Sequence, residues 1–192
     1  MRIARVIIGI LTLLVCNCAT APPITTAQAT NETKTTALML EKNKGERRVL
    51  RGWPGHPDPG ETFILKVDPK NGSSSHLVFM TGDLKPGAEI VTHRHPGADE
   101  ILYLESGTAE VHLGEAARVV HAGATVFIPS GTWISLSNTG SDAIQFVAVF
   151  SAPGFEEFMR DESVREGEKN VPVTQAEDDA IQKKHAHDVI YK

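Results

Sequence analysis

The stretch that decides the fold is residues 87–107, GAEIVTHRHPGADEILYLESG. His93 and His95 stand two residues apart in it, and Glu100 follows. Residues two apart on a β-strand project from the same face, so the two imidazoles can converge on one point. A hairpin turn at residues 96–99 would bring the Glu100 carboxylate back opposite them on the adjacent strand. Two imidazole nitrogens and one carboxylate oxygen form a ligand set for a borderline divalent cation.

Short β-rich runs separated by turn signals make up the body of the chain, residues 38–152. One of the turns, residues 68–72, has the composition of a hairpin loop. Short strands at regular spacing, with no helix between them, predict an all-β antiparallel sandwich or barrel. The expected strands are residues 49–50, 63–67, 76–80, 90–95, 101–104, 109–113, 119–121, 125–128, 134–137 and 144–150.

The C-terminal part, residues 153–192, departs from the β pattern. Apolar residues with helical spacing begin at Phe155 and predict a short helix packed on the outside of the barrel. A capping-box pattern that begins at Thr174 predicts a second helix. His185 and His187 are two residues apart at the end of this helix and point in different directions, so we expect both to be solvated.

The first 37 residues predict export followed by a tether. A basic start and about ten apolar residues are typical of an export signal and too short to span a membrane comfortably. This leader, residues 1–18, ends either at Cys18, which would then carry a lipid as in a bacterial lipoprotein, or at an ordinary cleavage site just beyond it. Residues 19–37, rich in Thr, Ala and Pro, read as a flexible tether.

This leader predicts where the protein acts. In a bacterium it would be periplasmic or anchored to the outer membrane, and otherwise it would be secreted. A lipid on Cys18 would be its sole membrane contact.

Composition and charge exclude several classes of protein. The 192 residues are 41% hydrophobic and 22% charged, as in an ordinary globular chain. The net charge is −5 and the sequence has no basic cluster, which argues against a nucleic-acid partner. Both cysteines, Cys16 and Cys18, belong to the leader, so the folded part must be stabilised by packing, with or without a metal.

Residues 77–150 resemble the cupin superfamily, whose fold is a double-stranded antiparallel, jelly-roll-like β-barrel. The first cupin motif is matched in full by Gly87, His93, His95, Glu100 and Gly107. The second motif is matched by Gly123, Pro129, Gly131 and Asn138, but Ile134 stands where the family has a histidine. The chain from Pro129 to Arg160 also looks like a group of small single-domain bacterial cupins. The four motif glycines are expected at turns with unusual backbone angles.

The resemblance implies that His93, His95 and Glu100 face the barrel interior as metal ligands. It places Ile134 there too, where a third imidazole usually binds, which leaves a two-His, one-carboxylate set with open positions. The family's usual metals are iron, manganese, zinc, nickel and copper, and the ligands do not choose among them. Fe(II) would make oxygenase chemistry feasible, and Zn(II) or Mn(II) would make Lewis-acid isomerisation or hydrolysis feasible. Metal affinity should fall as pH drops through the histidine range near ~6.5.

Other side chains are candidates for the same pocket. His76 stands on a preceding strand and faces the pocket or the solvent, according to a register that the sequence does not fix. Trp133 flanks the mouth, where it would stack on a ligand ring or pack against the tail. His56, His112 and His121 are expected at the surface.

These observations favour an exported metal-binding cupin with a small-molecule pocket, acting as an oxygenase or isomerase on a small polar substrate. The alternative is a non-catalytic cupin that has lost its metal and binds a carbohydrate or organic acid. A third reading makes the barrel a dimerisation module. Cupins often pair through barrel faces, and the outward-facing Ile101 and Tyr103 would suit a homodimer.

Overall fold

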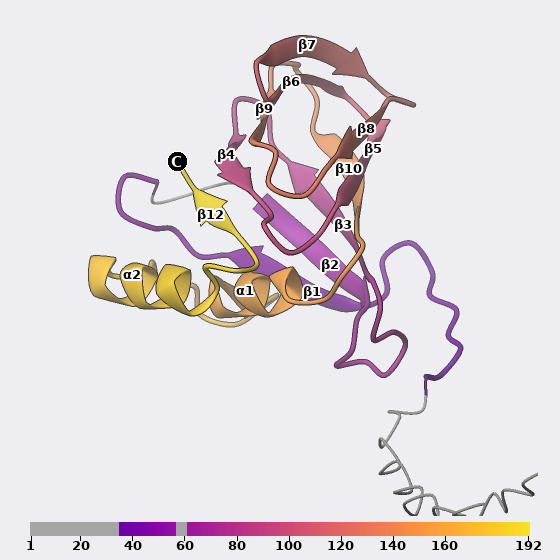
Figure 1. The fold of residues 1–192 in the computed structure, drawn as a ribbon, viewed down its shortest axis with the longest axis vertical. Helices are drawn as coiled ribbons and strands as arrows, with labels where there is room; N and C mark the ends of the chain where they lie inside the picture. Colours follow the sequence, from indigo (N-terminus) through magenta and orange to yellow (C-terminus); the bar gives the residue numbers. More distant parts are fainter. Residues whose placement is uncertain (1–34, 57–60) are drawn as a thin grey trace, which may run out of the picture. The chain divides into compact units, whose positions relative to one another are not determined.

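We describe a computed structural model of the chain in residues 35–56 and 61–192. The leader, Cys18 and most of the predicted tether lie outside these described residues. Twelve strands and two helices make up the described part (Figure 1). Their bounds are β1 Glu46–Leu50, β2 Glu61–Val67, β3 Val78–Leu84, β4 Glu89–Arg94, β5 Glu100–Ser106, β6 Thr108–Leu113, β7 Ala116–His121, β8 Thr125–Ile128, β9 Ile134–Asn138, β10 Ile144–Phe150, α1 Phe155–Asp161, β11 Ser163–Arg165, α2 Gln175–Lys184 and β12 Ile190–Tyr191.

The strands form two antiparallel sheets. One has seven strands in the order β11-β1-β2-β3-β10-β5-β8, and the other has five in the order β12-β4-β9-β6-β7. No strand is hydrogen-bonded to both sheets in the described part of the chain, so the architecture is a jelly-roll sandwich rather than a fully closed barrel. The predicted all-β, double-stranded antiparallel fold is confirmed.

Alternation of side chains along the strands builds the core between the sheets. Strands β3 and β10 alternate strictly between buried and partly buried residues, and β5 alternates between buried and exposed ones. This is the period of two expected of strands with one face on a core. Phe150, Leu65, Leu104 and Leu136 are among the largest fully buried side chains and come from both sheets. Ile101 and Tyr103 point outward, as predicted, and are about two-fifths exposed.

The predicted hairpin between His95 and Glu100 is wrong. Strand β4 pairs with β9 and β12, and β5 pairs with β10 and β8, so the segment between them crosses from one sheet to the other. His95 and Glu100 therefore face each other across the space between the two sheets, and they are not paired on neighbouring strands of one sheet. The hairpin at residues 68–72 does join paired strands, β2 and β3.

The four motif glycines adopt the backbone angles expected of them. Gly107 shows why the side chain must be absent there. It links β5 to β6 with φ +88°, and a Cβ would lie 3.0 Å from the Ile144 backbone. The φ angles of Gly87, Gly123 and Gly131 are also positive.

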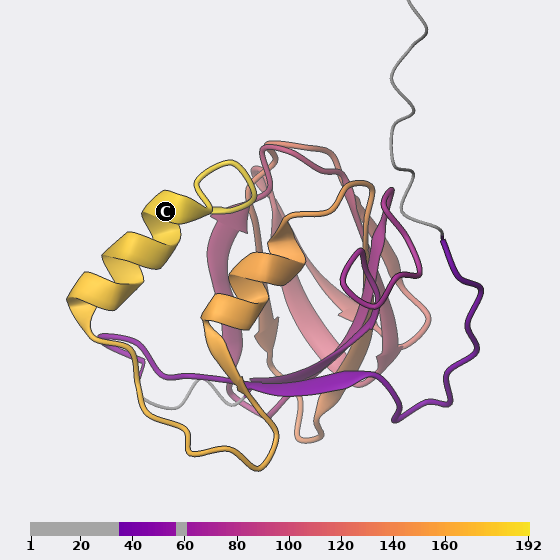
Figure 2. The same ribbon diagram turned by 90° about the horizontal axis from the view of Figure 1, so that it is seen from below.

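The C-terminal part contributes more than the expected helices. Its strand β11 extends the seven-stranded sheet beside β1, and β12 extends the five-stranded sheet beside β4. Helix α1 lies across the end of the barrel near β1, with α2 beside it (Figures 1 and 2). Phe158 and Met159 of α1 join the buried core, and the capping box at Thr174 opens α2 as predicted.

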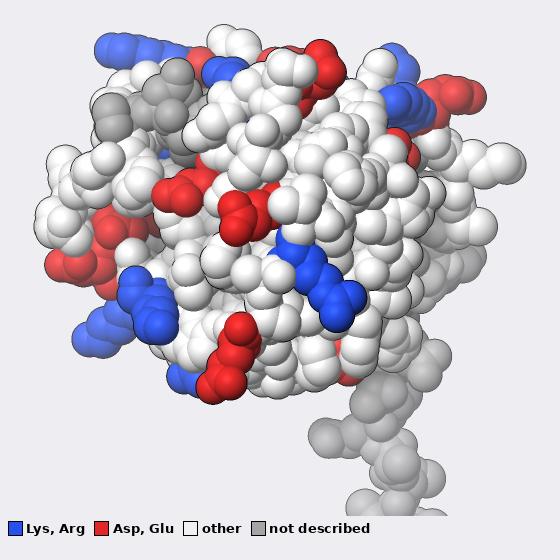
Figure 3. All heavy atoms as spheres, turned by 90° about the horizontal axis from the view of Figure 1, so that it is seen from above, with Lys and Arg blue, Asp and Glu red and all other residues white. Residues whose placement is uncertain are grey.

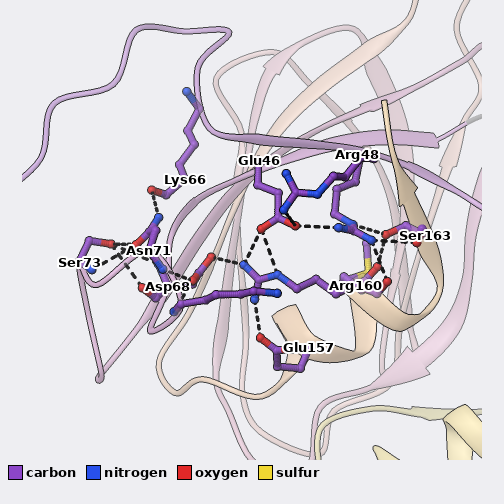
Figure 4. A network of polar contacts seen from close by, with 12 residues as sticks. Glu46, Arg48, Lys66, Asp68, Asn71, Ser73, Glu157, Arg160 and Ser163 are labelled. Atoms are coloured by element: carbon purple, nitrogen blue, oxygen red, sulfur yellow. Dashed lines mark hydrogen bonds and ion pairs between the residues drawn. The ribbon is translucent and has the colours of Figure 1, made fainter. Parts of the chain in front are cut away.

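A buried ionic network ties this segment to the first strands (Figure 4). The Arg160 guanidinium donates to Asp68 at 2.7 Å and to Glu46 at 2.8 Å, and it also pairs with Glu157. Arg48 of β1 donates to Glu46 at 2.7 Å and to the carbonyl oxygen of Ser163 at 2.8 Å. Asp68 is 1% exposed and Arg160 is 7% exposed, so these charges compensate each other inside the protein.

Charged side chains are scattered over the molecular surface seen from above in Figure 1 (Figure 3). Acidic and basic groups are interspersed there among uncharged residues, with no continuous patch of either sign on that face. In the described part of the chain, no helix is long and apolar enough to cross a membrane.

Arg160→Met should lower the free energy of unfolding by about 3 kcal/mol or more, because it leaves the Asp68 carboxylate buried without its cation. Urea denaturation measures this loss. Arg47→Met is the matched control, since Arg47 pairs with Glu166 at the surface and its loss should cost under about 1 kcal/mol. Equal losses in the two variants would contradict a special role for the buried network.

Candidate metal centre

Three side chains converge between the two sheets. His93 lies near the end of β4, His95 directly follows that strand, and Glu100 is the first residue of β5. Each contributes one potential ligand atom, and these atoms all lie within 4.8 Å of one another. The Nε2 atom of His95 is 3.5 Å from Oε2 of Glu100. All three side chains are buried, with 7%, 2% and 6% exposure respectively.

Backbone carbonyls fix which imidazole nitrogen faces the centre. His93 Nδ1 is 2.8 Å from the carbonyl oxygen of Val91, and His95 Nδ1 is 2.9 Å from that of Asp188. A carbonyl oxygen only accepts, so both Nδ1 atoms carry the proton and donate it. Each Nε2 is thereby left with a free lone pair, as in histidines that bind a metal.

The charges and pKa values of the three groups favour binding of a cation at the centre. Glu100 Oε2 is buried and has no hydrogen-bond partner. Burial raises the pKa of Glu100 to about 8. Burial and the neighbouring His93 lower the pKa of His95 to about 3, and burial also lowers the pKa of His93. All three groups are therefore driven to their neutral forms, whereas a divalent cation would restore the carboxylate. The donor set fits such a metal.

The cavity around these groups is small and otherwise apolar. Its volume is about 70 Å³, far below the roughly 300–1,000 Å³ of typical small-molecule pockets. Ile134 lines it and stands directly opposite His93 in the β4–β9 ladder, where the resemblance placed it. Its side chain offers no lone pair. Other lining residues include Leu102, Ile128, Phe146, Phe150, Phe155, Met159 and Tyr191.

Two side chains expected in the pocket lie elsewhere. Trp133 directly precedes Ile134 and does not line the cavity. Successive side chains of a strand point to opposite faces, so Trp133 and Ile134 cannot both face inward. The Arg94 guanidinium lies 4.7 Å from the centre of its ring in a cation–π contact. His76 is exposed, because β3 begins at Val78, later than the strand predicted from residue 76.

His185 is buried, contrary to the prediction that it is solvated. It is 4% exposed, with Nε2 2.8 Å from Asp161 Oδ2 and Nδ1 3.2 Å from Asp188 Oδ2. Helix α2 ends at Lys184, so the chain turns back at His185 and brings the ring against α1. His187 is 63% exposed in its side chain, as predicted.

The sequence reasoning missed how the C-terminal segment closes the centre. Phe155 packs edge-on against His95 with ring centroids 4.5 Å apart, and Tyr191 stands opposite His93 in the β12–β4 ladder. Asp188 supplies the carbonyl that holds His95. The glycine at position 154 was the one sequence signal of this arrangement. Gly154 has φ +138°, and a Cβ there would lie 2.1 Å from Asp188 Oδ1, so glycine allows the two segments to approach each other.

Comparison with known proteins identifies a cupin domain within the chain. Residues 80–150 match the family model described as Cupin domain. The fold is similar to that of an RmlC-like cupin from Shewanella frigidimarina, with 16% identity and a TM-score of 0.52 over 65% of this chain and 98% of that chain. It is also similar to a cupin-superfamily sugar phosphate isomerase from Silicibacter pomeroyi, with 20% identity and a TM-score of 0.52 over 61% of this chain and 77% of that chain.

A curated relative is closer in sequence over a shorter stretch. The oxalate-binding protein of Thermotoga maritima is 33% identical over 72 residues, which are 38% of this chain and 60% of the relative. The chain spans between 47% and 66% of the length of the curated relatives that it matches.

Metal affinity should rise with pH up to about 8 and then level off. Below that pH, a metal must displace the proton from Glu100, so affinity falls about tenfold per pH unit. Because the pKa values of His93 and His95 are lowered, protons should compete with the metal for these imidazoles only below pH ~6.5. Calorimetric titration with Ni²⁺ between pH 6.5 and 8.5 measures this slope.

Glu100→Gln is the control for this titration. It should bind Ni²⁺ more weakly and without the slope between pH 6.5 and 8, because no carboxyl proton is left to displace. A flat profile in the unmodified protein would exclude Glu100 as the competing group.

Proposed function

We propose that this cupin binds a divalent transition metal through His93, His95 and Glu100, and that a small molecule binds at the same centre. The observation that carries the proposal is the buried, unpartnered Oε2 of Glu100, which lies beside the free Nε2 of His95. A buried carboxylate without a partner destabilises the fold by several kcal/mol, so retention of this group favours a bound cation.

The residues of this centre have different roles. His93 and His95 act as neutral donors held by backbone carbonyls, and Glu100 acts as the anionic ligand. The apolar lining excludes water and strengthens each polar contact. A bound metal would supply Lewis acidity, or oxygen chemistry if it were Fe(II), at the coordination positions that the protein leaves open. Oxygenase or isomerase activity on a small polar substrate is consistent with this arrangement.

The size and charge of the cavity favour a small organic acid as the ligand. A divalent cation with one carboxylate leaves a net charge of +1 in apolar surroundings, which an anion would neutralise. The volume of about 70 Å³ is small beside the roughly 300–1,000 Å³ of typical ligand pockets, which favours a small ligand. The Thermotoga maritima relative, named as an oxalate-binding protein, supports the same class.

A second candidate is a non-catalytic binding protein without a metal. Ile134 favours it, since an aliphatic side chain occupies the position of the usual third imidazole. Of the two ligand classes expected for this alternative, a small organic acid suits the small cavity better than a bulkier carbohydrate.

Elemental analysis of the purified protein should find a transition metal at about one atom per chain. His93→Ala and Glu100→Gln should each reduce the bound metal at least tenfold, because each removes one of three ligands. His112→Ala is the matched control, since His112 lies on β6 with a side chain 54% exposed, and it should leave the metal content unchanged. Metal-free protein, after growth with each candidate metal supplied, would favour the second candidate.

We further propose that the protein is exported and acts as a homodimer. The basic and apolar start of the sequence supports export. The exposed Ile101, Tyr103 and Phe127, which lie together on the paired strands β5 and β8, support pairing through this face.

Labelling of the producing bacterium with a fatty-acid analogue tests the anchor. The label should appear in the full-length protein and be lost in Cys18→Ser. Export with no label in either protein would place the cleavage site beyond Cys18 and exclude a lipid anchor.

A further inference from the structure

A second cavity lies beside the metal centre and shares a wall with it. Its volume is about 280 Å³, four times that of the inner cavity. Ile90, Met159 and Tyr191 line both cavities. The two spaces are thus separated by single side chains, one of which is the tyrosine paired with His93.

Three carboxylates face this outer cavity from separate elements. Glu61 comes from β2, Glu162 from the junction of α1 and β11, and Asp178 from α2. Glu162 is 6% exposed and Asp178 is 8% exposed. Oε1 of Glu162 is buried and has no hydrogen-bond partner, so the wall of the cavity holds an acceptor that lacks a donor.

Their electrostatic effects show that these carboxylates lie near one another. Burial, and then the charge of Asp178, raise the pKa of Glu162 to about 7. The pKa of Tyr191 is raised by burial and by the charges of all three carboxylates. Tyr191 thus lines the outer cavity together with these carboxylates.

Nearby cationic groups of the chain leave Glu162 without an ion pair. Arg51 lies close enough to lower the pKa of Glu162, but its Nη2 donates to the carbonyl of Asp161 at 2.8 Å and its Nε has no partner. No ion pair to Glu162 occurs among the residues that the structure describes. Asp178 accepts a hydrogen bond from Gln182, and Lys192 also lines the cavity.

An aromatic surface adjoins the carboxylates. Trp53 lines the cavity and stacks on His56, with ring centroids 5.0 Å apart and an interplanar angle of 25°. Two backbone hydrogen bonds between the same two residues, 2.8 and 3.0 Å long, hold the turn that presents the rings. An indole face attracts organic cations through its quadrupole.

We propose that the outer cavity binds a small organic cation of the primary-amine class, with the ammonium group donating to Glu162 and the carbon skeleton resting on Trp53. A monatomic metal ion is not the favoured occupant. The described acidic and histidine groups whose ligand atoms converge closely enough to hold a metal are those of the inner centre, and the outer carboxylates are not among them. This site goes beyond the proposed function and does not depend on metal in the inner cavity.

Isothermal titration with benzylamine, whose ammonium and ring match the two surfaces, tests the proposal in the full-length protein. Metal-free and metal-loaded samples should bind it alike, and benzyl alcohol should bind at least tenfold more weakly. Glu162→Gln should weaken benzylamine binding at least tenfold. Trp53→Leu should weaken it severalfold through loss of the aromatic face.

Glu115→Gln, an exposed carboxylate in the turn between β6 and β7, is the matched control and should leave benzylamine binding unchanged. Glu162→Gln replaces an unpaired buried carboxylate with a neutral group of the same shape, so its melting temperature should not fall. Equal binding of benzyl alcohol and benzylamine, preference for glucose, or unaltered binding by folded Glu162→Gln would each overturn the proposal. Elemental analysis reports separately on the inner centre, so failure of one site is distinguishable from failure of the other.

Discussion

The Arg160 guanidinium is the contact on which the assembled centre depends. It reaches from α1 to Glu46 on β1 and to Asp68 after β2, and so fastens the C-terminal segment to the first hairpin (Figure 4). That segment then supplies Phe155 over His95, the Asp188 carbonyl that fixes its tautomer, and Tyr191 opposite His93. The barrel strands provide the ligand atoms, whereas the tail covers them and sets which nitrogen of His95 faces inward.

Burial of the three ligands determines their protonation states and so the chemistry of the centre. In water, two imidazoles and a carboxylate would hold ordinary protonation states at neutral pH. Between the two sheets, burial favours neutral forms of all three, which leaves two lone pairs and one displaceable proton around a space of about 70 Å³. The same burial strengthens the attraction of this set for a cation, because apolar surroundings screen charges less than bulk water does.

Local sequence patterns predicted most of the sandwich, because a period of two fixes which face a strand residue takes and glycine marks where the backbone must turn. The resemblance to cupins predicted the inward direction of His93, His95 and Ile134. The local patterns failed where residues close in sequence are not paired in space. His95 and Glu100 face each other from opposite sheets and not across a hairpin, a choice that the whole topology makes.

The residues that were missed share one property, which is that distant segments position them. His185 is buried because α2 packs back on α1, and Glu162 acquires its acidic neighbour from α2. No local pattern contains these facts, since each depends on how a C-terminal segment docks on a barrel that the earlier strands have already formed.

The two cavities on either side of Tyr191 have opposite electrostatic demands. A metal held by one carboxylate leaves the inner cavity with a positive charge, whereas the outer cavity presents three carboxylates and an unpartnered oxygen of Glu162. An anionic group is therefore favoured on the inner side of the wall and a cationic one on the outer side. An anion beside the metal and Glu100 would leave little net charge in the inner cavity, so its occupant should exert only a small field on a cation in the outer cavity. The two sites can therefore act independently although a single layer of side chains separates them.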